Sequence, residues 1–239
     1  GDDTTPEGEQ VNIYGNHVGS WNFAATAYLN QWKVKIYYEH YFDDHSQMFF
    51  QYGRWKDGHI GLEITFPKNR FIDTFVYEGL GTKDQTGPML YDSFWGEFEE
   101  QISAKDNYYN HYLYQGWQHW GMGIGNPLLP GPIYNKNGQI TFISNRVLAH
   151  HIGFCGSPCQ SLSYRMLLSY SRHWGTYDNP LNEIKKQFNS LFEVTYAPQQ
   201  LKGWSFTVSG AMDRGSMLGN NYGGMLVIRK QGIIKSGNK

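Results

Sequence analysis

Between residues 21 and 39, apolar and polar side chains alternate with a period of two, the pattern of a β-strand with one apolar and one polar face. The apolar set comes in two runs: Trp21, Phe23, Ala25, Ala27 and Leu29, then Trp32, Val34, Ile36 and Tyr38. Asn30 and Gln31 separate the runs, and a short polar connection of this kind joins the strands of a hairpin. We expect a strand, a tight turn and a second strand, whose polar face carries Lys33, Lys35, Tyr37 and Glu39.

The same alternation returns along the rest of the chain. It predicts strands over residues 59–66, 71–79, 139–153, 161–173, 190–197, 204–212 and 224–230. Residues 94–102 are acidic and alternate weakly, so they form either a further strand or a loop. The sequence therefore predicts an all-β chain of about eleven strands.

The connections between these strands alternate between short and long. Short turns are expected near Asn30, at residues 67–70, at the cysteine segment 155–159 and after Pro198, and long excursions at residues 40–58, 80–93, 173–189 and 213–223. Outer-membrane barrels have short periplasmic turns and long extracellular loops. We predict an antiparallel up-and-down transmembrane β-barrel over residues 19–232, between a flexible leader (1–18) and a tail (233–239). Bacterial barrels normally have an even strand number, so an odd count indicates either a miscounted strand or part of a larger barrel.

Composition narrows the possible partners. The 20 basic and 21 acidic residues nearly cancel, which removes the electrostatic case for nucleic acid. Aromatic residues make up 17% of the chain, yet no apolar run is long enough for a membrane helix. A barrel with aromatic girdles combines these features, as does an extracellular glycan-binding protein. The polar, acidic start is not a signal peptide and indicates a mature or truncated form.

The segment KDNYYNHYLYQGWQHWGMGIGNPLLPGPIY (residues 105–134) mixes aromatic rings with amides. Aromatic faces stack on the apolar faces of sugars, while Asn and Asp bind paired hydroxyls. The predicted glycan-binding residues are Asp106, Asn107, Tyr108, Tyr109, Asn110, His111, Trp117 and Trp120. The alternative is that the rings form an interfacial girdle and the Asn residues close turns.

Charged residues inside the predicted strands require a wet or ion-paired interior. Glu63, Arg146, Arg165 and Glu193 are expected to form a lumenal polar network, with Arg146 and His150 on one side of their strand and His151 on the other. The alternative is a constriction that admits acidic sugar. Cys155 and Cys159 are expected to form a disulfide across a turn, with two free thiols as the alternative.

No motif for catalysis or metal binding stands out. Glu39, His40, Asp43, Asp44 and His45 could bind a cation or supply a carboxylate pair, but neighbouring strand residues point to opposite faces, which favours a solvated loop. No G-x-S-x-G elbow places a nucleophile. We expect a protein that is not an enzyme and that needs no metal or cofactor.

Five phrases, in this order, are similar to the capsule-assembly Wzi family in its Bacteroidetes form. They are YYEHYFDDHSQMF (37–49), VYEGLGTKDQTGP (76–88), DNYYNHYLYQGW (106–117), GIGNPLLPGPIYN (123–135) and SNRVLAHHIG (144–153). The resemblance covers roughly residues 19–232 and looks like the C-terminal half to two-thirds of a family member. It implies an outer-membrane barrel of about eighteen strands. It also implies a lectin-like, non-enzymatic role in holding capsular polysaccharide at the cell surface.

Two other functions stay open at this point. A soluble secreted β-sandwich that binds or cleaves glycans would share the strands and the aromatic residues. A structural subunit of an outer-membrane assembly would have the same barrel, with other outer-membrane proteins in place of a sugar as its partners.

Overall fold

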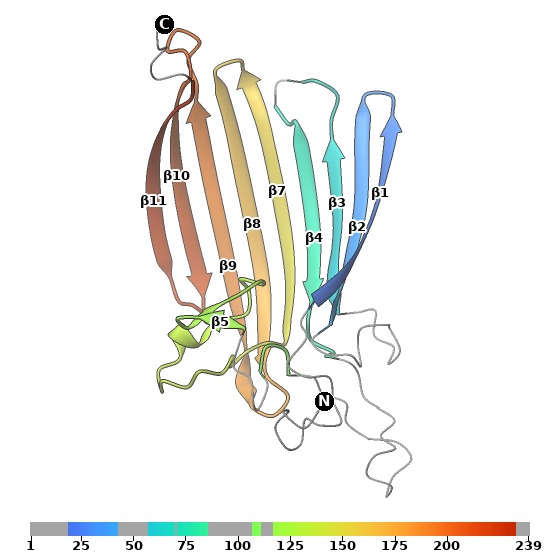
Figure 1. The fold of residues 1–239 in the computed structure, drawn as a ribbon, viewed down its shortest axis with the longest axis vertical. Coiled ribbons are helices and arrows are strands. Elements are labelled where there is room, and N and C mark those ends of the chain that lie inside the picture. Colours follow the sequence, from blue (N-terminus) through green and yellow to red (C-terminus); the bar gives the residue numbers. More distant parts are fainter. Residues whose placement is uncertain (1–18, 43–56, 70, 86–106, 111–116, 233–239) are drawn as a thin grey trace, which may run out of the picture.

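A computed structural model describes residues 19–42, 57–69, 71–85, 107–110 and 117–232. Nine strands form one antiparallel sheet, and each lies beside the strand that precedes or follows it along the chain (Figure 1). They are β1 (Gly19–Leu29), β2 (Trp32–Phe42), β3 (Gly58–Thr65), β4 (Thr74–Gly81), β7 (Val147–Cys159), β8 (Leu162–Gly175), β9 (Pro180–Tyr196), β10 (Trp204–Gly215) and β11 (Asn221–Lys230). The all-β, antiparallel, up-and-down prediction is therefore confirmed for this sheet.

A second, smaller unit follows β4 in the sequence. It contains the two-residue strands β5 (Gln118–His119) and β6 (Met122–Gly123) and the 3-10 helix η1 (Pro132–Tyr134). In Figure 1 this segment lies at the end of the sheet opposite the β1–β2 and β7–β8 turns. Within the described residues, no helix is long and apolar enough to cross a membrane.

The two faces of the sheet differ in chemistry because side chains alternate along each strand. One face, here called the apolar face, is exposed and carries large hydrophobic side chains from every part of the sheet. Its exposed members include Trp21, Phe23, Ile36, Ile60, Ile152, Phe192, Val208, Leu226 and Ile228. The register places Ala25 opposite Ile36 on this face, and Ala24 opposite Tyr37 on the other. The second face, here called the polar face, carries most of the charged and hydroxyl side chains.

The small core lies at one end of the polar face. Leu80 of β4 and Val147 and Ala149 of β7 pack there against Tyr109, Leu129 and Phe142. Hydrogen bonds add to this packing, because Asn110 donates to Phe142 O (2.8 Å) and accepts from Phe142 N (2.7 Å). The loop after β4 is thus fixed onto the sheet.

The connections differ from the prediction at one end of the sheet. The short turns near Asn30, at residues 67–70 and after Pro198 are present, but the expected excursions at residues 173–189 and 213–223 are largely strand. β8 and β9 meet in a tight turn in which Thr176 Oγ1 accepts from Asn179 N (2.9 Å). The prediction failed there because Glu183, Lys185 and Lys186 spread charge over both faces of β9 and hide its alternation.

Two further expectations in β7 are corrected. The strand begins at Val147 and not near residue 139, because residues 139–146 run as irregular chain against the core. Cys155 and Cys159 are both free. They lie within one extended strand, where four residues span about 13 Å, far beyond the roughly 4–7 Å between the Cα atoms of a disulfide. The turn is formed instead by residues 160–161, after the second cysteine.

The strand or loop expected at residues 94–102, the leader at 1–18 and the tail at 233–239 lie outside the described residues.

Candidate functional site

The polar face is hollowed where the segment around residues 125–130 covers it. The cavity, here called the polar hollow, has a volume of about 830 Å³. Such a volume falls within the roughly 300–1,000 Å³ of small-molecule sites. Its sheet side presents the titratable residues Glu39, His59, Glu78, His151 and His173, together with the hydroxyl and amide residues Ser20, Ser169, Ser171, Gln187 and Asn189.

Strand register brings these residues together from distant parts of the chain. One transverse row runs Tyr37, Gly61, Glu78, His151, Ser169, Asn189 and Asp213, each directly opposite the next. The neighbouring row contains Asn22, Glu39, His59, Leu80, Ala149, Ser171 and Gln187. Directly opposed residues have Cβ atoms about 5 Å apart, so polar side chains in these rows can interact in sequence across the sheet.

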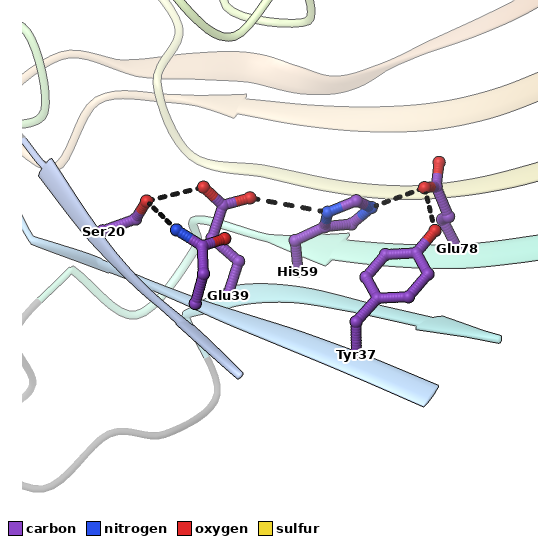
Figure 2. Close-up of polar contacts among 6 residues, drawn as sticks. Ser20, Tyr37, Glu39, His59 and Glu78 are labelled. Atoms are coloured by element: carbon purple, nitrogen blue, oxygen red, sulfur yellow. Dashed lines mark hydrogen bonds and ion pairs between the residues drawn. The ribbon is translucent and has the colours of Figure 1, made fainter. Parts of the chain in front are cut away.

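His59 connects two carboxylates at the centre of these rows. Its Nδ1 atom lies 3.7 Å from Glu39 Oε2, and its Nε2 atom lies 3.5 Å from Glu78 Oε1. Figure 2 shows the imidazole between the two glutamates, with Ser20 donating to Glu39 Oε1 at 2.6 Å. A protonated imidazole can form ion pairs with both partners, since both of its ring nitrogens then carry hydrogen.

Glu78 has a second donor because Gly61 leaves room for it. Tyr37 donates its hydroxyl to Glu78 Oε1 across the intervening strand β3 (Figure 2). A Cβ atom at Gly61 would lie 2.0 Å from Tyr37 Cζ. The glycine therefore allows the tyrosine ring to lie over β3 and reach a residue two strands away.

The other half of the polar hollow is lined by neutral hydrogen-bonding groups. His151 Nδ1 lies 2.7 Å from Ser169 Oγ, and His173 Nε2 lies 2.9 Å from Ser171 Oγ. His173 is only 3% exposed, and its Nδ1 atom has no hydrogen-bond partner among the described residues. Buried polar atoms are rarely left unpaired, so this nitrogen is a candidate contact for a ligand.

The loops beside the hollow are held by Asp57, which lies just before β3. Its carboxylate accepts from Asp84 N (2.9 Å), from Gln85 N and from the Tyr108 hydroxyl (2.9 Å). Burial raises the pKa of Asp57 to about 6, although the three donors act in the opposite direction. Asp57 thus joins the chain after β4 to the segment that contains Tyr108.

The predicted glycan-binding residues are divided by the structure. Tyr108 and Tyr109 are buried, and Asn107 and Asn110 hydrogen bond within the loop and to the core, so these four fix the loop in place. Trp117 is partly buried against the same core, whereas Trp120 is 86% exposed. Asp106 and His111 lie outside the described residues. Among the described members of this set, only Trp120 presents an open aromatic face.

The predicted lumenal network is also divided. Arg165 pairs with Glu193 at 3.3 Å, and Glu63 pairs instead with Lys33 at 3.4 Å. Arg146 lies before β7 and donates to Lys83 O (3.2 Å), with its guanidinium over the Tyr177 ring. It belongs to the loops and does not join the other three.

Sequence reasoning placed His150 and His151 on opposite sides, as the register does, but it did not select His59, Glu78 or His173. Single-residue alternation predicts the face of a side chain but not its neighbour on the next strand.

Of the acidic cluster at residues 39–45, Glu39 reaches the polar hollow, His40 is buried near Tyr38, and Asp43, Asp44 and His45 lie outside the described residues.

In the described part of the chain, no group of three or more His, Cys, Asp or Glu residues is arranged to hold a metal ion. The residues of the hollow suit hydrogen bonding to a polyhydroxylated molecule. No family model, curated protein or solved structure matches the chain.

Proposed function

We propose that the protein forms an outer-membrane β-barrel, or part of one, that binds or organises capsular or surface polysaccharide at the cell surface without catalysing a reaction. The observation that carries the proposal is the difference between the two faces of one continuous sheet. The apolar face leaves Phe23 54%, Val208 61% and Leu226 64% exposed. The opposite face holds the polar hollow.

Lipid is the environment that suits the apolar face. Soluble proteins rarely expose a continuous apolar area of this extent, whereas barrels in the outer membrane alternate apolar residues outward and polar residues inward. Among the described residues, the sheet order contains no second large sheet that would cover this face as in a β-sandwich. Outer-membrane lipid is therefore the expected partner of the apolar face.

A sugar is the ligand that suits the polar face. The hollow combines carboxylate, imidazole, hydroxyl and amide groups, which can bind several hydroxyls at once. Trp120 adds an exposed ring, and it lies shortly before residues 125–130, which cover the hollow. The order of sequence phrases similar to the capsule-assembly Wzi family supports the same ligand class.

Membrane fractionation tests the first half of the proposal. We expect the full-length protein to fractionate with the outer membrane and to migrate faster on a gel when unheated, as folded barrels do. Recovery in the soluble fraction without a heat-dependent shift would contradict the barrel, and the secreted β-sandwich would replace it.

Capsule retention tests the second half. We expect a deletion strain to release its surface polysaccharide into the medium, and the intact gene to restore retention. A strain that lacks the protein yet keeps its polysaccharide would contradict the glycan role. A membrane-embedded protein without that role would be a structural subunit of an outer-membrane assembly.

A further inference from the structure

We propose that the polar hollow binds a sugar segment without an anionic substituent, either neutral or amino-bearing, and discriminates against uronic acids and other acidic sugars. This inference rests on the proposed function and specifies its ligand. It also reverses the sequence-based alternative of an interior that admits acidic sugar.

Charge is the first argument. The described residues that line the hollow include Glu39 and Glu78 but neither lysine nor arginine. The cations Lys33 and Arg165 lie elsewhere on the polar face, where they pair with Glu63 and Glu193. The Lys35 ammonium lies over the Tyr37 ring and does not line the hollow. Proteins that bind carboxylate, sulfate or phosphate use arginine or lysine for this purpose. A ligand carboxylate would here meet the carboxylates of Glu39 and Glu78, because the His59 imidazole between them is already paired with both. This repulsion is strengthened where water is excluded.

Hydrogen-bonding capacity is the second argument. Each carboxylate offers about four acceptor positions, and the contacts of Glu39 and Glu78 with Ser20, His59 and Tyr37 leave some of them for a ligand. Hydroxyl and ammonium groups donate to such acceptors, whereas an anionic group cannot. The two glutamates therefore favour a ligand rich in donors.

The unpaired ring nitrogen is the third argument. His173 lines the hollow, is 3% exposed and leaves Nδ1 without a partner among the described residues. This atom has almost no exposed surface, so the His173 ring must rotate toward the hollow before a sugar hydroxyl can donate to Nδ1 or accept from it. The hollow thus offers carboxylate acceptors on one side and an imidazole with serine hydroxyls on the other, both suited to a polyol.

Matched oligosaccharides provide the test. Hexasaccharides of β-1,4-linked glucose, glucosamine and glucuronic acid differ only in their substituents, and binding to the folded protein in detergent can be measured by calorimetry. We expect the glucose or glucosamine hexasaccharide to bind at least about tenfold more tightly than the glucuronic acid hexasaccharide. Equal or tighter binding of the glucuronic acid hexasaccharide would overturn the inference.

Two substitutions locate the binding. His173→Phe removes the ring nitrogens from the hollow and is expected to weaken binding of the preferred sugar by about tenfold. His150→Phe is the control, because His150 lies on the apolar face beside Tyr77. Folding of both variants is checked by heat-dependent gel mobility. Equal binding by the two variants would place the site elsewhere and overturn the inference.

Glu39→Gln removes one lining charge and is expected to reduce the preference against glucuronic acid. An unchanged preference in this variant would contradict the charge argument. If none of the three sugars binds, the inference fails, and the capsule-retention assay then shows whether the proposed function fails with it.

Discussion

Gly61 is the residue on which the contact between Tyr37 and Glu78 depends. Replacement with alanine would place a methyl group 2.0 Å from Tyr37 Cζ and force the ring away from Glu78. Overpacking of this kind costs about 1–3 kcal/mol. We expect Gly61→Ala to lower the urea midpoint of unfolding, followed by tryptophan fluorescence in detergent.

Gly210→Ala in β10 is the matched control for this substitution. A Cβ atom at Gly210 would meet no atom within 4 Å, so the same chemical change is expected to leave the midpoint unchanged or to raise it. Equal midpoints for the two variants would show that Tyr37 does not depend on the glycine.

Asp57 gives the fold a defined response to pH. Burial raises its pKa to about 6 in the folded chain from an ordinary value of 3.8, so the folded state binds this proton more tightly than the unfolded chain. Stability supplied by the protonated carboxyl is therefore full below about pH 4 and is lost as pH rises through about 6. The slope in this window is at most about 1.4 kcal/mol per pH unit.

The comparison with Asp57→Asn isolates this contribution, since asparagine does not titrate. We expect the difference in unfolding free energy, wild type minus variant, to decrease from pH 4 to pH 6. A difference that stays constant, or that grows with pH, would show that burial does not dominate at Asp57.

At the scale of elements, the hairpin of β5 and β6 holds a tryptophan in an unusual turn. Trp120 has φ +52° and Gly121 has φ +78°, both left-handed, where turns of this type prefer Asn-Gly. The turn is fixed by hydrogen bonds from Gly121 N to Gln118 Oε1 (2.7 Å) and from Ile133 N to Gly121 O (2.9 Å). A strained tryptophan with an exposed ring is the kind of outlier that motivates a functional hypothesis.

We expect Trp120→Asn to separate stability from function. Asparagine tolerates left-handed φ, so the unfolding midpoint should hold or rise, by up to about 1 kcal/mol in free energy. Polysaccharide retention should weaken by at least about fivefold if the ring stacks on sugar, since an aromatic contact residue is worth 1 kcal/mol or more. Ile140→Asn serves as the control, because Ile140 is also exposed and also lies in the chain between β4 and β7. Unchanged retention in Trp120→Asn would assign the ring no role in binding.

The strands were more accessible to sequence reasoning than the contacts between them. Residues 21–39 alternate cleanly because one face of β1 and β2 is apolar and the other polar, so the hairpin followed from the pattern. One row joins Tyr37, Glu78 and His151, which come from segments far apart in the sequence. Tyr37 and Glu78, for example, are 41 residues apart. Local periodicity contains no information on such pairings. The polar hollow was therefore not predicted, although Glu39, His59, Glu78 and His151 were assigned to strands.

The aromatic loop shows the opposite limit. The composition of residues 107–110 suits both a sugar surface and a folded loop. Contacts with residues distant in the sequence favour the folded loop: Asn110 donates to Phe142 O, and the Tyr108 hydroxyl donates to Asp57. Burial of Tyr108 and Tyr109 is a tertiary effect, so the sequence alone could not separate these two from the exposed Trp120.

For the whole molecule, the question is which solvent each face of the sheet meets. Ala24 and Ala25 provide a matched pair, since they are neighbours in β1, both exposed, and lie on opposite faces. Ala25→Lys would place a charge on the apolar face, where lipid contact costs about 2–4 kcal/mol near the middle of the membrane. Ala24→Lys would place the same charge on the polar face, beside Tyr37 and Lys35.

We expect Ala25→Lys to reduce the amount of folded protein in the outer membrane and to lower its unfolding midpoint in lipid vesicles, while Ala24→Lys leaves both close to wild type. The same pair in a soluble sandwich would behave differently, because a second layer packed on the apolar face would make Ala25→Lys prevent folding in water as well. Equal tolerance of both substitutions in the membrane would mean that lipid does not contact β1 on its apolar face. The sheet would then need another partner on that side.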